Sequence, residues 1–160
     1  MKRRLIIVGV MLVMLVMVNT VVAKGPPREV VITGPGIEGE LVVRDTARLE
    51  HLGIVGLMVI PESIGMPSHT GPGYTLVRDG WDKARYYPDL SGGPGYVYYV
   101  GLINGWSEYD GHWFAATPEG DAEMRSLLAT QGIRFDAAGY YVSTPSQVRP
   151  FSPFQIYRPL

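Results

Sequence analysis

Residues 74–87 read YTLVRDGWDKARYY, two strand-like runs on either side of the pair Asp79-Gly80. Tyr, Thr and Val favour extended structure, and Asp-Gly is a common turn pair in β-hairpins. The stretch therefore predicts strands at 74–78 and 84–87 joined by a tight turn. Further strand-like runs at 96–103 and 112–116 follow, separated by turns at 88–95 and at 104–105 or 110–111. Four such runs in succession predict an antiparallel meander.

Two helices are predicted outside the meander. Asp45 is a good N-cap for a short helix from Thr46 to Leu52, which ends before a glycine. Thr117 caps the second helix, Pro118 to Gln131, because proline suits the first helical position. Met, Leu and Leu then recur at helical spacing inside this second helix, so one of its faces packs on the core.

Two more strand pairs complete the predicted fold. The runs at 29–33 and 40–44 predict a hairpin near the start of the domain, and those at 133–135 and 140–143 predict a last pair of strands. We therefore predict an α+β fold. It consists of a small, mainly antiparallel β-sheet with one packed helix and one short helix, preceded by an N-terminal signal or anchor helix.

The first residues resemble an export signal. The cations Lys2, Arg3 and Arg4 precede an apolar run at 5–18, and small residues lead up to Ala23. A cationic start, an apolar segment and small residues before the cleavage point are typical of a signal peptide. As a helix the apolar run would span roughly 21 Å, short of the roughly 30 Å hydrocarbon core of a bilayer. This length favours cleavage after Ala23.

An uncleaved anchor is the alternative, because a helix extended over residues 5–23 approaches the thickness of the bilayer. The cations before it place the domain outside the cytoplasmic membrane in either case. We accordingly divide the chain into a signal peptide or transmembrane anchor at 1–23, one globular domain at 24–144, and an extended Pro- and aromatic-rich tail at 145–160.

Composition excludes several classes of function. The chain contains no cysteine, which excludes a lipid-anchored thiol, thiol catalysis, c-type haem attachment and cysteine-based zinc sites. Without residues 1–23 the Lys and Arg count falls from 14 to 11 against 15 Asp and Glu, so the net charge is −4. An acidic domain is a poor partner for nucleic acid, which requires a surplus of cations.

The densest group of potentially catalytic residues is at 106–113, where Glu108, Asp110 and His112 stand among aromatic residues. At the end of a hairpin, such residues can serve general acid–base catalysis. His69, in the long Pro/Gly loop at 61–72, is a further candidate. The alternative is structural, since Asp-Gly is a turn pair and a metal site needs three or four ligands. We expect no metal or cofactor.

Aromatic residues give a second candidate site. Alternation along the strands can place Tyr86, Tyr98, Trp106 and Trp113 on an exposed sheet face. Aromatic rings offer a large contact area at low entropic cost, so such a platform suits a protein, peptide or carbohydrate at the cell surface. The alternative is that these rings border an ordinary core.

The tail at 145–160 carries Phe151, Phe154 and Tyr157 at a spacing of three, which a polyproline II conformation would align on one face. We expect the tail to lie on its own domain, with a partner groove as the alternative. The sequence as a whole favours a non-catalytic binding or interaction module outside the cytoplasmic membrane. The alternatives are a small exported hydrolase-like or metal-assisted enzyme and a membrane-tethered accessory subunit.

Overall fold

The computed structural model describes residues 26–103, 105–135 and 141–143. The predicted signal segment and the aromatic tail lie outside these residues. In chain order, the elements of the described part are β1 (Val30–Thr33), β2 (Leu41–Val43), α2 (Thr46–Leu52), α3 (Ile54–Leu57), β3 (Tyr74–Arg78), β4 (Asp82–Tyr87), β5 (Tyr96–Leu102), β6 (His112–Ala115), α4 (Pro118–Thr130), β7 (Ile133–Phe135) and β8 (Tyr141–Ser143).

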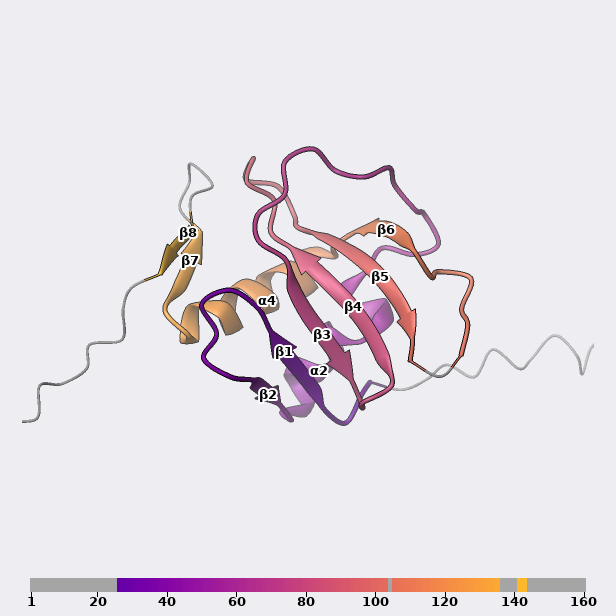
Figure 1. The fold of residues 1–160 in the computed structure, drawn as a ribbon, viewed down its shortest axis with the longest axis horizontal. Helices are drawn as coiled ribbons and strands as arrows, with labels where there is room; N and C mark the ends of the chain where they lie inside the picture. The colour runs from indigo at the N-terminus through magenta and orange to yellow at the C-terminus, as the bar shows by residue number, and fades with distance from the viewer. Residues whose placement is uncertain (1–25, 104, 136–140, 144–160) are drawn as a thin grey trace, which may run out of the picture.

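Six of these strands form one antiparallel sheet in the order β2-β1-β3-β4-β5-β6. Strands β3 to β6 are the predicted meander, and β1 and β2 form the predicted hairpin. Strand β1 also pairs with β3, which joins the hairpin to the meander. Strands β7 and β8 pair with each other, apart from the main sheet and beside α4 (Figure 1). The described chain is therefore an α+β fold.

The predicted bounds need small corrections. Strand β4 begins at Asp82 rather than at residue 84, because Asp82 pairs in register with Arg78 and both side chains are buried. Strands β5 and β6 each end one residue earlier than predicted. Helix α4 ends at Thr130, and Gln131 is its C-cap.

Side chains at the N-terminal ends of α2 and α4 accept hydrogen bonds as the sequence predicts. The carboxylate of Asp45 accepts from the backbone N–H of Arg48, and the hydroxyl of Thr117 accepts from that of Gly120. The same Thr117 hydroxyl donates to the carbonyl of Gly56 in α3, which ties α4 to the neighbouring helix.

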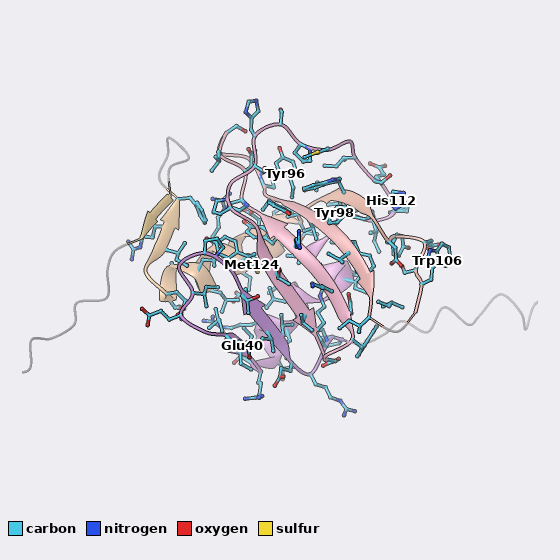
Figure 2. All side chains as sticks on the ribbon, viewed as in Figure 1. Glu40, Tyr96, Tyr98, Trp106, His112 and Met124 are labelled. Atoms are coloured by element: carbon cyan, nitrogen blue, oxygen red, sulfur yellow. The ribbon has the colours of Figure 1, made fainter. Side chains whose placement is uncertain are left out.

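The core lies between the sheet and the three helices, which all cover one face of the sheet (Figure 1). Ile32 and Leu76 from the strands, and Leu52, Met124 and Leu128 from the helices, are fully buried there. Met124 lies on the helix side of the sheet in Figure 2. Each such side chain contributes about 1.5–3 kcal/mol by burial, so this face supplies most of the stabilising apolar contact.

The segment between α3 and β3 runs from the β6 side of the sheet to the β3 side (Figure 1). On its way it borders β6: the N–H of Val59 donates to the carbonyl of Ala115 at 2.9 Å, and that of Ile64 donates to the carbonyl of Trp113 at 2.8 Å. Backbone groups at this edge of the sheet are thereby partly paired.

Candidate functional site

The sheet has one face without a helix. Along β4, Asp82, Ala84 and Tyr86 are buried beneath the helices, so the intervening side chains point to the opposite face. No described element lies in front of this face in Figure 1. The same alternation applies to β5 and β6. We call the following six residues the aromatic–cationic face: Lys83, Arg85, Tyr87, Tyr96, Tyr98 and Trp113.

Trp113 lies at the centre of the aromatic part of this face. It pairs in register with Tyr98 on β5, and the two ring centroids are 5.1 Å apart at an interplanar angle of 49°. The ring of Tyr87 also contacts Trp113, with centroids 5.1 Å apart and an interplanar angle of 44°. Tyr87 in turn covers Gly73, where an added Cβ would stand 2.7 Å from the tyrosine ring. Mutual packing therefore holds the three rings in place.

Two cations stand beside these rings. Arg85 is exposed and pairs in register with Tyr98 on one side and Thr75 on the other. Lys83 is half-buried, two positions away on the same strand face. Neither cation takes part in any of the ion pairs among the described residues. This part of an acidic protein therefore presents positive charge without a counter-charge.

The rest of the open face is uncharged and consists mainly of valines, with Thr33 and Thr75 paired in register among them. Val31 pairs in register with Val42 on one side and with Val77 on the other, and Val100 lies at the irregular part of β5. Val42 and Val100 are 39% and 38% exposed. Lys83 and Arg85 are the only charged residues among the outward-pointing residues of the six described strands.

The four aromatic residues predicted for an exposed platform do not all lie on the same face of the sheet. Tyr98 and Trp113 are in contact on the open face, but Tyr86 is fully buried on the helix side. Trp106 is 79% exposed and lies in the loop after β5, at the edge of the molecule in Figure 2. The prediction overlooked Tyr87, which has the same strand parity as Arg85; this parity is the signal that could have identified it.

Tyr86 instead belongs to a buried polar network. Its hydroxyl donates to Oδ1 of Asp121 at 2.6 Å, and the N–H of Gly95 donates to the same oxygen at 2.8 Å. Arg125 donates to the other carboxylate oxygen at 2.8 Å. Burial, reinforced by the negative charge of Asp121, raises the pKa of the Tyr86 hydroxyl well above its usual value. This neutral hydroxyl fixes α4 to the sheet.

The candidate catalytic residues are dispersed. His69 is exposed in the long loop, and its carbonyl accepts from the N–H of Leu90. His112 is exposed at the start of β6, beside Trp113, which bridges to Ile64 early in the long loop. His69 lies farther along that loop, where Thr70 bridges to Asp89. Asp110 is half-buried, and its carboxylate accepts from the N–H of Ser107 at 3.1 Å.

Glu108 is exposed and accepts a hydrogen bond from its neighbour Tyr109, which raises the pKa of that tyrosine. Within residues 26–103 and 105–135, no hydrogen bond or ion pair joins any two of the four candidates His69, Glu108, Asp110 and His112. No group of three or more potential metal ligands occurs among the described residues. The structure therefore does not assemble these side chains into one catalytic cluster.

A separate ionic network lies under the β3–β4 turn. Arg78 and Asp82 are 2% and 1% exposed and form an ion pair at 3.2 Å, and Nε of Arg78 donates to the carbonyl of Leu52 at 2.6 Å. The hydroxyl of Tyr99 bonds to Asp82, and burial together with that carboxylate raises the pKa of Tyr99. Because both charged side chains are almost completely buried, we assign this network to the core.

Comparison with protein-family models, curated proteins and solved structures found no match. Across the described residues, no helix combines the length and apolar character needed to cross a membrane. The surface chemistry of this chain is therefore the basis of its proposed function.

Proposed function

We propose that the protein is a non-catalytic binding module outside the cytoplasmic membrane, and that its aromatic–cationic face binds an anionic partner. The observation that carries this proposal is the pairing of two uncompensated cations with three packed aromatic rings on an uncovered sheet face. The location follows from the signal-like segment at 1–23.

The packed rings and the exposed cations both favour binding at this face. The rings are already held by their neighbours, so contact with a partner orders few additional side chains. Arg85 offers planar, bidentate hydrogen bonding to a carboxylate or similar anion. The outward-pointing strand residues carry no carboxylate, and Asp89, which accepts from the Tyr96 hydroxyl at the border of this face, is only 5% exposed. The exposed charges that an anionic group meets on these strands are therefore positive.

Charge also argues against two other occupants. A second copy placed face to face would bring Arg85 and Lys83 against the same two cations, which is unfavourable. The tail at 145–160 contains Arg149 and Arg158 but no Asp or Glu, so its side chains offer no counter-charge. An anionic molecule from outside the chain is the better complement.

Retention on anionic columns tests the proposal. We expect the exported protein to be retained on immobilised polygalacturonate or poly-L-glutamate at about 50 mM NaCl and released at higher salt, where charges are screened. The double variant Lys83→Gln/Arg85→Gln should lose most of this retention. Arg134→Gln, which removes an exposed cation on β7, should not. Equal retention of the double variant, or no retention of the wild type on either column, would contradict the proposal.

A further inference from the structure

The face that we propose to bind an anion also indicates what kind of anion it binds. We infer that the partner is an acidic polysaccharide with a carboxylate on its sugar ring, lying across the strands over Arg85, Tyr98 and Trp113. This inference rests on the proposed function and makes it more specific.

The open face offers no free main-chain hydrogen-bonding groups along β3 and β4. Strands β3 to β6 pair with one another, so their backbone groups are used within the sheet. A peptide lying flat on this face would lose water from its own N–H and C=O groups without gaining main-chain partners. Proteins that bind extended peptides through a sheet usually add them at an edge, where such partners are free. The open face is thus poorly suited to an extended peptide.

A sugar ring meets the same surface differently. Its C–H groups form an apolar face that can stack on an aromatic ring, while its hydroxyl groups lie around the periphery and stay in contact with water. The rings of Tyr98 and Trp113 are half-buried with centroids 5.1 Å apart, so they present adjacent stacking surfaces. A saccharide therefore loses fewer hydrogen bonds on this face than a peptide does.

The strand register aligns the candidate binding residues in a row across the sheet. Thr75, Arg85, Tyr98 and Trp113 form one row across four strands, because each is the register partner of the next. At about 4.8 Å per strand the row is about 14 Å long, a length that a few linked sugar rings span. Within this row Arg85 lies directly beside Tyr98, so its guanidinium can hold the carboxylate of a sugar stacked on that tyrosine.

Lys83 provides a second contact. It lies two residues before Arg85 on the same face of β4, roughly 7 Å away along the strand. Because Lys83 flanks the row at Arg85 and does not lie within it, its charge adds to the attraction for a carboxylate held by Arg85, whereas a neutral saccharide would use neither cation. The valine part of the face, by contrast, offers no polar contact, and it marks the limit of the proposed binding row.

Calorimetric titration of the exported protein with oligomers of equal length tests the inference. The acidic saccharides are hexamers of galacturonate and mannuronate and the hyaluronan hexasaccharide. Methyl-esterified hexagalacturonate serves as the uncharged counterpart, and hexaglutamate as the peptide counterpart. We expect at least one acidic saccharide to bind at least 10-fold more tightly than both counterparts.

Variants assign the binding to the row. Arg85→Gln should weaken binding of the acidic saccharide about 10-fold or more, because a charge-assisted hydrogen bond is lost. Tyr98→Ala should weaken it to a similar extent, and Trp113→Phe should weaken it less because a ring remains. Arg134→Gln is the matched control and should leave the affinity unchanged. Thermal unfolding of each variant checks that the fold is retained.

The outcomes separate this inference from the function on which it rests. Hexaglutamate binding as tightly as the saccharides, with the same dependence on Arg85, would overturn the inference and leave an anion-binding face. Equal binding of the methyl ester would show that the carboxylate is not recognised and would also overturn it. If none of the oligomers binds, or if Arg85→Gln has no effect, both proposals are wrong.

Discussion

Arg78 holds a permanent positive charge inside the domain. Its partner Asp82 lies directly opposite it in the β3–β4 hairpin, and both side chains are almost completely buried. Burial disfavours the charged form and lowers the pKa of Arg78, while the adjacent carboxylate opposes this shift. One terminal nitrogen of Arg78, Nη2, is buried without a hydrogen-bond partner among the described residues. Such a pair contributes to stability only while both charges are present.

We therefore predict that Arg78→Met lowers the free energy of unfolding by about 3–5 kcal/mol, because it leaves Asp82 buried and uncompensated. Urea denaturation at neutral pH measures this change. The double variant Arg78→Met/Asp82→Leu serves as the control and should be more stable than the single variant, because no buried charge remains. A double variant that is no more stable than the single one would contradict this account.

A second carboxylate, Asp89, couples the loop after β4 to pH. Burial raises the pKa of Asp89, but hydrogen bonds from Ser91, Gly93 and Tyr96 together outweigh burial, so the pKa lies below its usual value. The pKa is therefore lower in the folded protein than in the unfolded chain, where it is about 3.9. These contacts stabilise the fold above about pH 4, and their contribution is lost as the pH falls through the folded-state pKa.

Asp89→Asn should accordingly cost about 1–3 kcal/mol at pH 7, since bonds to a charged acceptor are weakened. The difference from the wild type should shrink below about pH 4, where the wild-type carboxylate becomes protonated. Urea denaturation across pH 3–7 measures both quantities, with Glu62→Gln in an exposed loop position as the control. A difference that stays constant over this range would show that the charge of Asp89 is not responsible.

At the scale of elements, local signals in the sequence predicted α2 and α4 but not α3, which has four residues and no side-chain cap. Helix α2 spans Thr46–Leu52 as predicted, because Asp45 supplies a cap and Gly53 follows. The start of β4 was predicted two residues late, since two charged residues at 82–83 do not resemble a strand. The burial of Asp82 depends on Arg78 across the hairpin, and such pairing is not visible in the local pattern.

The same limit applied to the candidate site. The prediction selected Tyr86 for the surface, yet its neighbour Tyr87 lies there, because adjacent residues of a strand point to opposite faces. Which face of β4 meets the helices depends on the packing of α4, whose Asp121 accepts from the Tyr86 hydroxyl. That contact joins residues 35 positions apart, so it is not visible in the local sequence. The local signal was the charged Arg85, which has the same strand parity as Tyr87, and the prediction did not use it.

Helices α3 and α4 approach each other closely at Gly120. An ideal Cβ built there would lie 2.8 Å from both the carbonyl oxygen of Gly56 and the Cα of Leu57. We predict that Gly120→Ala lowers the free energy of unfolding by about 1–3 kcal/mol, because the backbone must move apart. Helix propensity alone predicts the opposite, a gain of about 1 kcal/mol.

Thermal or urea unfolding distinguishes the two expectations for Gly120. The exposed neighbour Glu119, in the same helical turn, supplies the control variant Glu119→Ala, which should change stability by no more than about 0.5 kcal/mol. Stabilisation by Gly120→Ala would mean that the two helices separate at little cost.

At the scale of the whole molecule, the order of strands could not be read from the sequence. The meander follows from consecutive runs and turns, but β1 pairs with β3 across an interval that contains two helices and a long loop. Nothing in the pattern of β1 specifies that partner. The sheet was therefore predicted as a hairpin and a meander, and the structure joins them into six strands.

The proposed location gives a prediction for the whole chain. If residues 1–23 act as a cleaved signal, the protein recovered outside the cytoplasmic membrane should begin at Lys24 and lack the mass of the leader. Intact-mass measurement and cell fractionation test this, with a variant in which Ala23 is replaced by Arg as the control for cleavage. Full-length protein in the membrane would indicate the anchor instead, and full-length protein in the cytosol would contradict export altogether.

The two edge strands of the six-stranded sheet, β2 and β6, leave few backbone groups free to pair with other molecules. This limits aggregation at high protein concentration. One border strand, β2, has only three residues, and the other, β6, is partly occupied by Val59 and Ile64. Long unpaired borders recruit strands from other molecules and seed fibrils. Because neither border offers such a template, many copies can accumulate side by side without polymerising, and the broad faces of their sheets stay accessible.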